Sequence, residues 1–274
     1  MGLRVNTNVA SLTAQRNLGG VTSRLQGNYA RLSSGLRIAN ASDDAAGLGI
    51  SERLRSQTRS FAQAGRNAQD GISLAQTAEG SSQEVSNLLG RLRELAVQAS
   101  NGTLSDDDRT TIDTEFAEVT EEIDRIADET TFNGVALFDG TSTGVSIQVG
   151  INSGETIDIG LSDLPTSTLG VDTGSLDVTT QTGAQAALED IDDAIDDVNT
   201  ARGAIGASQN RLQSTVSSIA NIRENLSAAE SRIRDVDVAL ETADLTRNSI
   251  LQQAATSVLS QANSQPQLAL SLLN

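Results

Sequence analysis

The densest group of potential metal ligands in this sequence is a row of acidic side chains between residues 189 and 197. The row consists of Glu189, Asp190, Asp192, Asp193, Asp196 and Asp197. Carboxylate oxygens are the ligands that hard divalent cations take in proteins, but the row lacks the loop spacing and glycine of a dedicated calcium site. Apolar residues recur between the acids at Leu188, Ile191, Ile195 and Val198. We therefore expect a helix with a solvated acidic face and no metal site.

The chain lacks most of the side chains that enzymes use for catalysis. It contains no His and no Cys, and all nineteen basic residues are Arg. Without His, Lys or Cys, no triad, activated nucleophile or disulfide can be built, and the commonest metal ligands are missing. The sequence predicts a protein that is not an enzyme and that holds no cofactor or metal.

Charge and hydropathy exclude two further classes of partner. The formal net charge is −17, which makes nucleic acid an improbable ligand. No run of eighteen apolar residues is present, so we expect no membrane partner, and the N-terminus lacks the pattern of a cleavable secretory signal.

The strongest pattern is an apolar ladder at helical spacing near the C-terminus. It comprises Ile219, Ile222, Leu226, Ala229, Ile233, Val236, Leu240, Ala243, Leu251, Ala254 and Val258. A similar set near the N-terminus, with one slip between Leu12 and Leu18, comprises Val5, Val9, Leu12, Leu18, Val21, Leu25, Tyr29, Leu32 and Leu36. Such stripes call for partner helices, so both ends are predicted to be helices in contact.

Composition favours a thin molecule over a thick one. Aromatic residues make up 2% of the chain, with four Phe, one Tyr and no Trp, whereas large rings usually fill a globular core. Leu, Ile, Val and Ala at helical spacing suit an elongated rod, which buries little surface per residue. We expect such a chain to gain much of its burial from neighbouring copies.

Capping and breaking residues divide the chain into long helices. A helix is predicted over residues 1–39, and the polar residues 40–44 then cap a second helix over about 44–99, roughly 80 Å long at 1.5 Å per residue. Residues 101–103 end it. Ser105 followed by three Asp residues begins a third helix, which should fold back antiparallel because the connection is short.

The hydrophobic period changes to two after Gly134. Val145, Ile147, Val149 and Ile151 alternate with small or polar residues, as do Ile157, Ile159 and Leu161 beyond the turn at 152–155. This predicts a β-hairpin. Residues 162–183 are predicted to be irregular loop, and helix returns at Ala184. The expected fold is mainly α: an elongated, discontinuous coiled-coil rod with a small β-hairpin region at about 140–175 and paired N- and C-terminal helices.

Specific sequence words add a family resemblance. Near the N-terminus they are residues 5–8 (VNTN), 31–38 (RLSSGLRI), 41–48 (ASDDAAGL) and 131–134 (TFNG). Near the C-terminus they are residues 235–237 (DVD), 250–254 (ILQQA) and 261–273 (QANSQPQLALSLL). Because these words occur in this order at both ends, the chain resembles the bacterial flagellins. Only about fifty residues separate Gly134 from Ala184, so it resembles a minimal form lacking the variable outer domains, and without His it cannot build the zinc protease that some relatives insert there.

The resemblance implies a structural subunit that polymerises into the flagellar filament used for swimming. It implies that residues 1–43 and 236–274 form an inner-tube helical domain and that residues 44–235 form the surrounding rod domain. It also implies export without a cleavable signal, unfolded and through the flagellar export apparatus, to assembly at the distal tip outside the cell. The implied partners are copies of the chain itself, an export chaperone at the C-terminal region, and the filament cap and hook-junction proteins. The alternative is a hook-filament junction protein, which resembles flagellin at both ends.

Two sets of candidate site residues follow. The residues for packing in the tube are Val5, Val9, Leu12, Leu251, Ala254, Val258, Leu270 and Leu273; the plainer interpretation is a core within one chain. By resemblance, Arg91, Leu95 and Glu115 would contact the animal innate-immune receptor for flagellin. The plainer interpretation is that Leu95 belongs to an apolar stripe and that the two charged residues are solvated.

Overall fold

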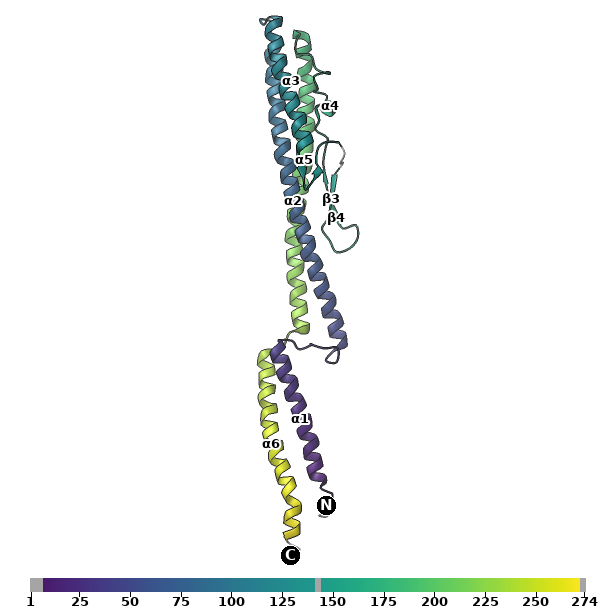
Figure 1. Cartoon of the computed structure of the whole chain (residues 1–274), viewed down its shortest axis with the longest axis vertical. Helices are drawn as coiled ribbons and strands as arrows, with labels where there is room; N and C mark the ends of the chain where they lie inside the picture. Colours follow the sequence, from purple (N-terminus) through teal and green to yellow (C-terminus); the bar gives the residue numbers. More distant parts are fainter. Residues whose placement is uncertain (1–6, 141–143, 272–274) are drawn as a thin grey trace. The chain divides into compact units, whose positions relative to one another are not determined.

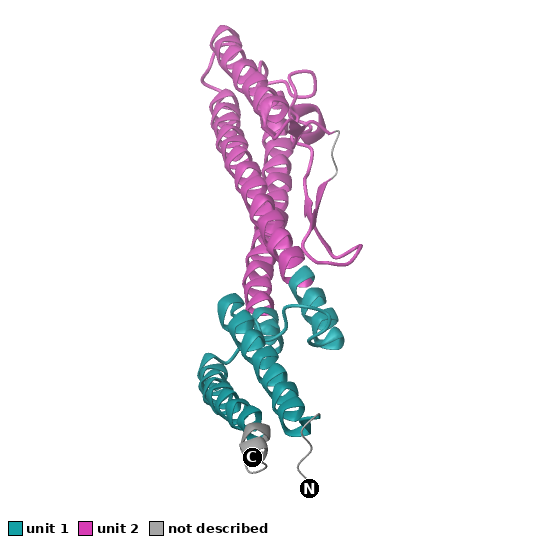
Figure 2. Ribbon diagram, turned by 60° about the horizontal axis from the view of Figure 1, so that its bottom comes forward, with its two compact units in different colours: residues 1–56, 225–274 teal, residues 57–224 magenta. Residues whose placement is uncertain are grey.

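The structure, a computed structural model, describes residues 7–140 and 144–271, with side chains up to Gln265. The helices are α1 (Val9–Ser34), α2 (Ala45–Ala99), α3 (Asp106–Glu129), α4 (Thr166–Leu169), α5 (Gln181–Arg234) and α6 (Val238–Ser271) (Figure 1). The strands are β1 (Thr131–Phe132), β2 (Val135–Ala136), β3 (Gly144–Gln148) and β4 (Thr156–Gly160). The chain divides into two compact units, residues 1–56 with 225–274 and residues 57–224 (Figure 2). The predicted class, mainly α with a β-hairpin and paired terminal helices, is confirmed.

The unit of residues 57–224 is built on three helices, α2, α3 and α5. Its largest fully buried side chains include Leu89, Leu92, Leu95, Phe116, Ile123, Ile191 and Ile205. Ser105 and Asp108 form a reciprocal capping box at the start of α3, as its sequence predicts. The turn before α3 is held by Arg109, whose Nε donates to the carbonyl of Ala99 over 3.0 Å. The predicted return of α3 along α2 is confirmed.

The predicted hairpin is confirmed as the antiparallel pair β3 and β4, with Ile147 opposite Ile157. It packs into the same core, where Ile157 and Ile159 are buried, and Asn67 of α2 donates to the carbonyl of Gln148 over 3.1 Å.

Two small elements were not predicted. Strands β1 and β2 pair around Asn133 and Gly134, which both have positive φ angles of 51° and 80°, and Asn-Gly is a frequent tight hairpin turn. The stretch 162–183, predicted to be irregular, contains the short helix α4.

The unit of residues 1–56 and 225–274 contains α1 and α6. The prediction of helix over residues 1–39 is wrong at its end, because α1 stops at Ser34 and Gly35 adopts a left-handed conformation with φ 71°, a common helix stop. Asp237 caps α6, accepting from the backbone N–H groups of Ala239 and Leu240 at 2.9 and 3.1 Å. The apolar ladder predicted for residues 219–258 is therefore divided between α5 and α6.

Candidate functional site

The contact between α1 and α6 is an antiparallel two-helix seam. Its buried and half-buried positions recur in alternating steps of three and four, the spacing of a coiled coil. On α1 they are Ser11, Ala14, Leu18, Val21, Leu25, Asn28 and Leu32; on α6 they are Glu241, Leu245, Asn248, Gln252, Ala255, Leu259 and Ala262. The predicted contact between the terminal helices is confirmed, but on another face of α6. Leu240 and Ala243, which belong to the predicted stripe, are exposed.

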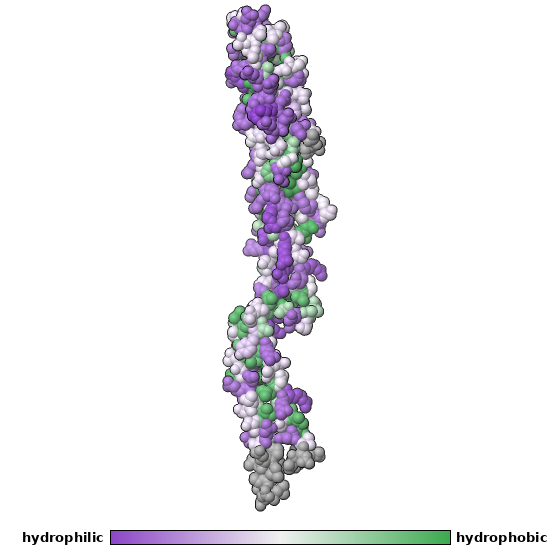
Figure 3. All heavy atoms as spheres, viewed as in Figure 1, coloured by the Kyte–Doolittle hydropathy of each residue, from purple (hydrophilic) through white to green (hydrophobic). Residues whose placement is uncertain are grey.

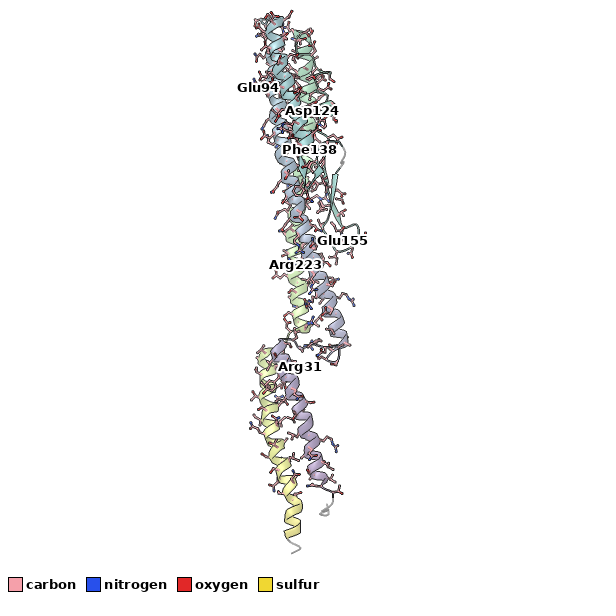
Figure 4. The ribbon with its side chains drawn as sticks, viewed as in Figure 1. Arg31, Glu94, Asp124, Phe138, Glu155 and Arg223 are labelled. Carbon is pink, nitrogen blue, oxygen red and sulfur yellow. The ribbon has the colours of Figure 1, made fainter. Side chains whose placement is uncertain are left out.

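A buried polar cluster interrupts this seam. Asn28 Nδ2 donates to Glu241 Oε1 over 2.5 Å, and Asn248 Nδ2 donates to Asn28 Oδ1 over 2.7 Å. The three residues are only 6%, 5% and 9% exposed. Arg31, labelled on α1 in Figure 4, lies 3.9 Å from the second oxygen of Glu241. Sequence reasoning missed this cluster, although Glu241 and Asn248 lie seven residues apart, which places them on one face of a helix.

A second polar contact lies toward the other end of the seam. Ser11 Oγ donates to Asn263 Oδ1 over 2.6 Å, and Asn8 Nδ2 donates to the carbonyl of Ala262 over 2.7 Å. Polar side chains thus connect α1 and α6 at two separate levels.

A second set of apolar side chains on the two helices lies outside the seam and is exposed. Large apolar residues that are between 42% and 65% exposed are Val9, Leu12, Val238, Leu240, Ile250, Leu251 and Val258, and Tyr29 is 56% exposed. Figure 3 shows hydrophobic surface at intervals along these helices. A run of exposed large apolar residues on a small helical unit is typical of a surface that binds another protein.

The predicted tube-packing residues fall on this outward surface where they are described. Val9, Leu12, Leu251, Ala254 and Val258 are all exposed, so the plainer interpretation of a core within one chain does not account for them. Val5, Leu273 and the side chain of Leu270 lie outside the described residues.

A short main-chain contact joins the segment after α1 to the segment before α6. Leu36 and Asp235 form an isolated antiparallel bridge. Val236 N–H donates to the carbonyl of Gly35 over 3.0 Å, and Arg37 N–H donates to the carbonyl of Arg234 over 2.7 Å. These bonds hold the two helix breaks of the unit together.

The three predicted receptor-contact residues lie on α2 and α3. Arg91 Nε and Nη2 both donate to Glu115 Oε1, at 3.0 and 2.5 Å, and Nη1 donates to Glu94, which Figure 4 labels. These hydrogen bonds, with that of Glu115 the strongest influence, raise the pKa of Arg91. Leu95 is 1% exposed and belongs to the core. Of the three residues, Arg91 and Glu115 present an accessible surface.

The acidic row lies on α5, as the sequence predicts. Asp192 accepts from Arg93 of α2, with Nε 2.6 Å from Oδ1, and this hydrogen bond lowers the pKa of Asp192. Within the described residues, no three His, Cys, Asp or Glu side chains gather into a group that could hold a metal ion. A bilayer-spanning helix is likewise not found in the described part of the chain.

Comparison with known proteins covers both ends of the chain. The sequence model of the bacterial flagellin N-terminal helical region matches residues 5–143, and that of the C-terminal helical region matches residues 188–273. A flagellin of Halalkalibacterium halodurans is 48% identical over 269 residues, covering 98% of this chain and 99% of the relative. A flagellin of Bacillus subtilis is 42% identical over 303 residues, covering 99% of this chain and all of the relative.

A solved structure agrees with these matches. The crystal structure of Bacillus cereus flagellin is 34% identical and superposes with a TM-score of 0.51, covering 56% of this chain and 88% of that one.

Proposed function

Because the chain belongs to the bacterial flagellin family and is a subunit of the flagellar filament that lacks a large variable domain, we propose how its parts serve the filament. Residues 1–43 and 236–274 form the inner-tube helical domain, and residues 44–235 form the coiled-coil rod domain around it. Its relatives are structural flagellins, and we propose no catalytic role.

The observation that carries this proposal is the outward apolar surface of α1 and α6. The seam between the helices leaves Leu12, Leu251 and Val258 in water when the chain is alone. Fully burying a side chain of this size contributes about 1.5–3 kcal/mol. Because these side chains are about half exposed, packing against further copies of the chain would recover about half of that free energy for each, which favours a polymer.

We assign the inter-subunit contacts to the residues named from the sequence. They are Val5, Val9, Leu12, Leu251, Ala254, Val258, Leu270 and Leu273. The five whose side chains are described are exposed, as side chains reserved for a neighbouring subunit must be in a single chain.

Seeded polymerisation tests the proposal. Purified protein is mixed with short filament seeds or a precipitating salt, and the product is examined by electron microscopy. Long hollow filaments are the expected result. Persistent monomers or short rings would favour the alternative, a hook-filament junction protein, which supplies a short adaptor zone and does not propagate.

A truncation tests the assignment of the tail. Deleting residues 255–274 removes Val258 and the final apolar residues while leaving the unit of residues 57–224 intact. The truncated chain is expected to remain a soluble monomer that does not polymerise. Normal filaments from it would contradict a role of the tail in the tube.

The route to the filament follows the family. We propose that the chain leaves the cell unfolded through the flagellar export apparatus, without a cleavable signal, and adds at the distal tip beneath the cap. Before export, a dedicated chaperone would cover the C-terminal region, and the first subunits would meet the hook-junction proteins. The filament itself is extracellular. Co-purification of the chaperone with the full chain but not with the truncated chain is the test.

We also propose that the monomer is recognised by the animal innate-immune receptor for flagellin. Arg91 and Glu115 offer a paired, accessible surface. Leu95 would act from beneath, by supporting that part of α2 in the core. To test this, purified monomer is added at increasing concentrations to cells that express the receptor. Receptor signalling is the expected result, and no signalling at any concentration would refute the proposal.

A further inference from the structure

The polar cluster of Asn28, Glu241 and Asn248 lies where an apolar seam would be more stable. Each member is at least nine-tenths buried, and each donates or accepts a hydrogen bond across the helix pair. Removing a carboxylate from water is unfavourable, and well-packed apolar side chains in the same place often give equal or greater stability. The cluster therefore needs an explanation other than stability.

The apolar part of the seam specifies the register of the two helices poorly. The hydrogen bond between Ser11 and Asn263 adds little discrimination, because Asn263 is exposed and water can replace Ser11 as its partner. Most other seam positions are small or aliphatic, among them Ala14, Leu18, Ala255 and Leu259, and they repeat every seven residues. Sliding α6 by one repeat, about 10 Å at 1.5 Å per residue, would again place aliphatic residues against aliphatic residues. Such repeats are prone to alternative pairings unless a polar residue excludes them.

The cluster distinguishes the observed register from its neighbours. Asn28 lies between Glu241 and Asn248, donating to one and accepting from the other. A slip of one repeat in either direction would take Asn28 away from one of them. In one direction the buried Glu241 carboxylate would lose its amide donor, and a buried charge without its partner is strongly destabilising.

The main-chain bridge of Leu36 and Asp235 does not supply the same discrimination. Its hydrogen bonds join backbone groups, which nearly every residue possesses. A slip of one repeat would break these hydrogen bonds, each of which contributes about 0.5–1.5 kcal/mol, whereas leaving a buried carboxylate without its partner costs more. The buried side chains of the cluster therefore penalise a change of register more strongly than the bridge does.

We propose that Asn28, Glu241 and Asn248 form a register lock, which fixes how α1 and α6 of one chain align at the expense of stability. The antiparallel pairing places Tyr29 near the level of Leu240, and Leu12 near that of Val258. A fixed register gives every copy the same outward apolar pattern for the next copy to meet. This inference rests on the proposed packing of the helix pair in the filament.

The test measures register directly with spin labels. The chain has no Cys, so Gln15→Cys and Ala243→Cys, both at exposed positions, give two unique attachment sites. Their levels along the pair differ by roughly 20 Å, so a slip of one repeat changes the axial offset by about 10 Å. Labelled chains are diluted about twentyfold into unlabelled filaments, and the distance within each chain is read by pulsed electron spin resonance.

Three variants address the lock, with one control. Asn28→Leu/Glu241→Leu/Asn248→Leu gives an apolar seam. Asn28→Glu places a second carboxylate beside that of Glu241. The exchange Asn28→Glu/Glu241→Asn leaves a single carboxylate, at position 28, between amide side chains at positions 241 and 248. The control Gln252→Leu adds an apolar side chain to the same seam without touching the cluster.

The lock predicts one narrow distance for the unmodified seam, for Gln252→Leu and for the exchange variant. It predicts a second distance, displaced by about 10 Å, for the triple leucine variant. A triple leucine variant with the single original distance and normal filaments would overturn the lock. If that variant stays out of filaments, the others decide: entry of the exchange variant but not of Asn28→Glu supports the lock, and equal behaviour of the two refutes it. Failure of the unmodified chain to form filaments would count against the proposed function itself.

Discussion

Gly71 of α2 lies against Ile147 of the hairpin so closely that a methyl group on Gly71 would stand 3.0 Å from Ile147 Cγ1. The same methyl group would also stand 3.3 Å from a methyl of Leu212 on α5. The hairpin reaches the helices at a position where a helix would otherwise favour Ala over Gly. Of the glycines in α2, Gly80 has open space around it, which makes the two positions a matched pair.

We expect Gly80→Ala to raise the free energy of unfolding by up to about 1 kcal/mol, the gain in helix propensity. Gly71→Ala gains the same propensity but forces Ile147 and Leu212 to move, so it should be at least about 1 kcal/mol less stable than Gly80→Ala. Urea denaturation of the full chain, followed by circular dichroism, measures both. Equal stabilisation by the two substitutions would show that Ile147 and Leu212 can move away from the added methyl group at no cost in free energy.

The ion pair of Arg93 and Asp192 should make part of the stability dependent on pH. The hydrogen bond from Arg93 lowers the pKa of Asp192 below its ordinary value of 3.8. A carboxylate with a lowered pKa stabilises the folded state above its unfolded pKa, and this contribution is lost as the pH falls through the folded pKa. Asp192→Asn should therefore reduce stability at pH 7 and have little effect well below pH 3.8.

Asp193→Asn is the control for that measurement. It removes the same charge from the neighbouring exposed position on α5, so both variants change the net charge equally. Denaturation curves at several pH values separate loss of the pair from loss of charge. Identical pH profiles for the two variants would show that the ion pair contributes nothing beyond its charge.

Single substitutions on the outward face should weaken assembly without unfolding the subunit. Val258 is 58% exposed, so Val258→Ser should change monomer stability by less than about 0.5 kcal/mol. Loss of an apolar side chain from a buried contact should raise the critical concentration for polymerisation by about tenfold. Ser257→Ala, at the next exposed position, should leave it unchanged, and the sedimented fraction against total protein measures both.

Substitutions at the two surface residues of the receptor-contact set should affect receptor signalling, whereas substitution of the core residue should affect the stability of the fold. Arg91→Ala and Glu115→Ala should reduce signalling while leaving the subunit folded, because each is about half exposed. Leu95→Ala should lower the free energy of unfolding by about 2–5 kcal/mol through the cavity that it leaves. Arg125→Ala, which removes another half-exposed, doubly ion-paired Arg, is the control and should signal normally.

The sequence predicts this fold well wherever capping and periodicity agree. Ser105 with Asp108 marks the start of α3, and alternation at Ile157 and Ile159 marks the hairpin, because both signals are local. The sequence predicts the end of α1 too late, because the polar residues 40–44 give a stronger cap signal than Gly35 alone. In the sequence, Asn133 and Gly134 mark only a change of hydrophobic period, whereas in the structure they form the turn between β1 and β2.

The seam of α1 and α6 shows where hydrophobic patterning fails. The pattern marks Leu240, Leu251 and Val258 as the contacting stripe, while the helix pair instead encloses Glu241 and Asn248. Periodicity identifies which residues avoid water but not whether their partner is the same chain or another copy. In a protein that forms a polymer, the most apolar face can be reserved for the neighbour, and the internal contact then falls on a mixed face.

The pairing of α1 with α6 joins residues that are very far apart in the sequence. Asn8 finds its hydrogen-bond partner 254 residues further along the chain, and Asn28 finds Asn248 220 residues further. Contacts of such sequence separation form slowly, because the intervening loop must close before any bond rewards it. The unit of residues 57–224 is closed by contacts of smaller sequence separation, such as that of Arg93 with Asp192, so we expect the contact between the terminal helices to form last. A terminal helix whose partner has not yet formed exposes its seam side chains as well as its outward ones, so an incompletely folded chain presents more apolar surface for unintended association than a folded one.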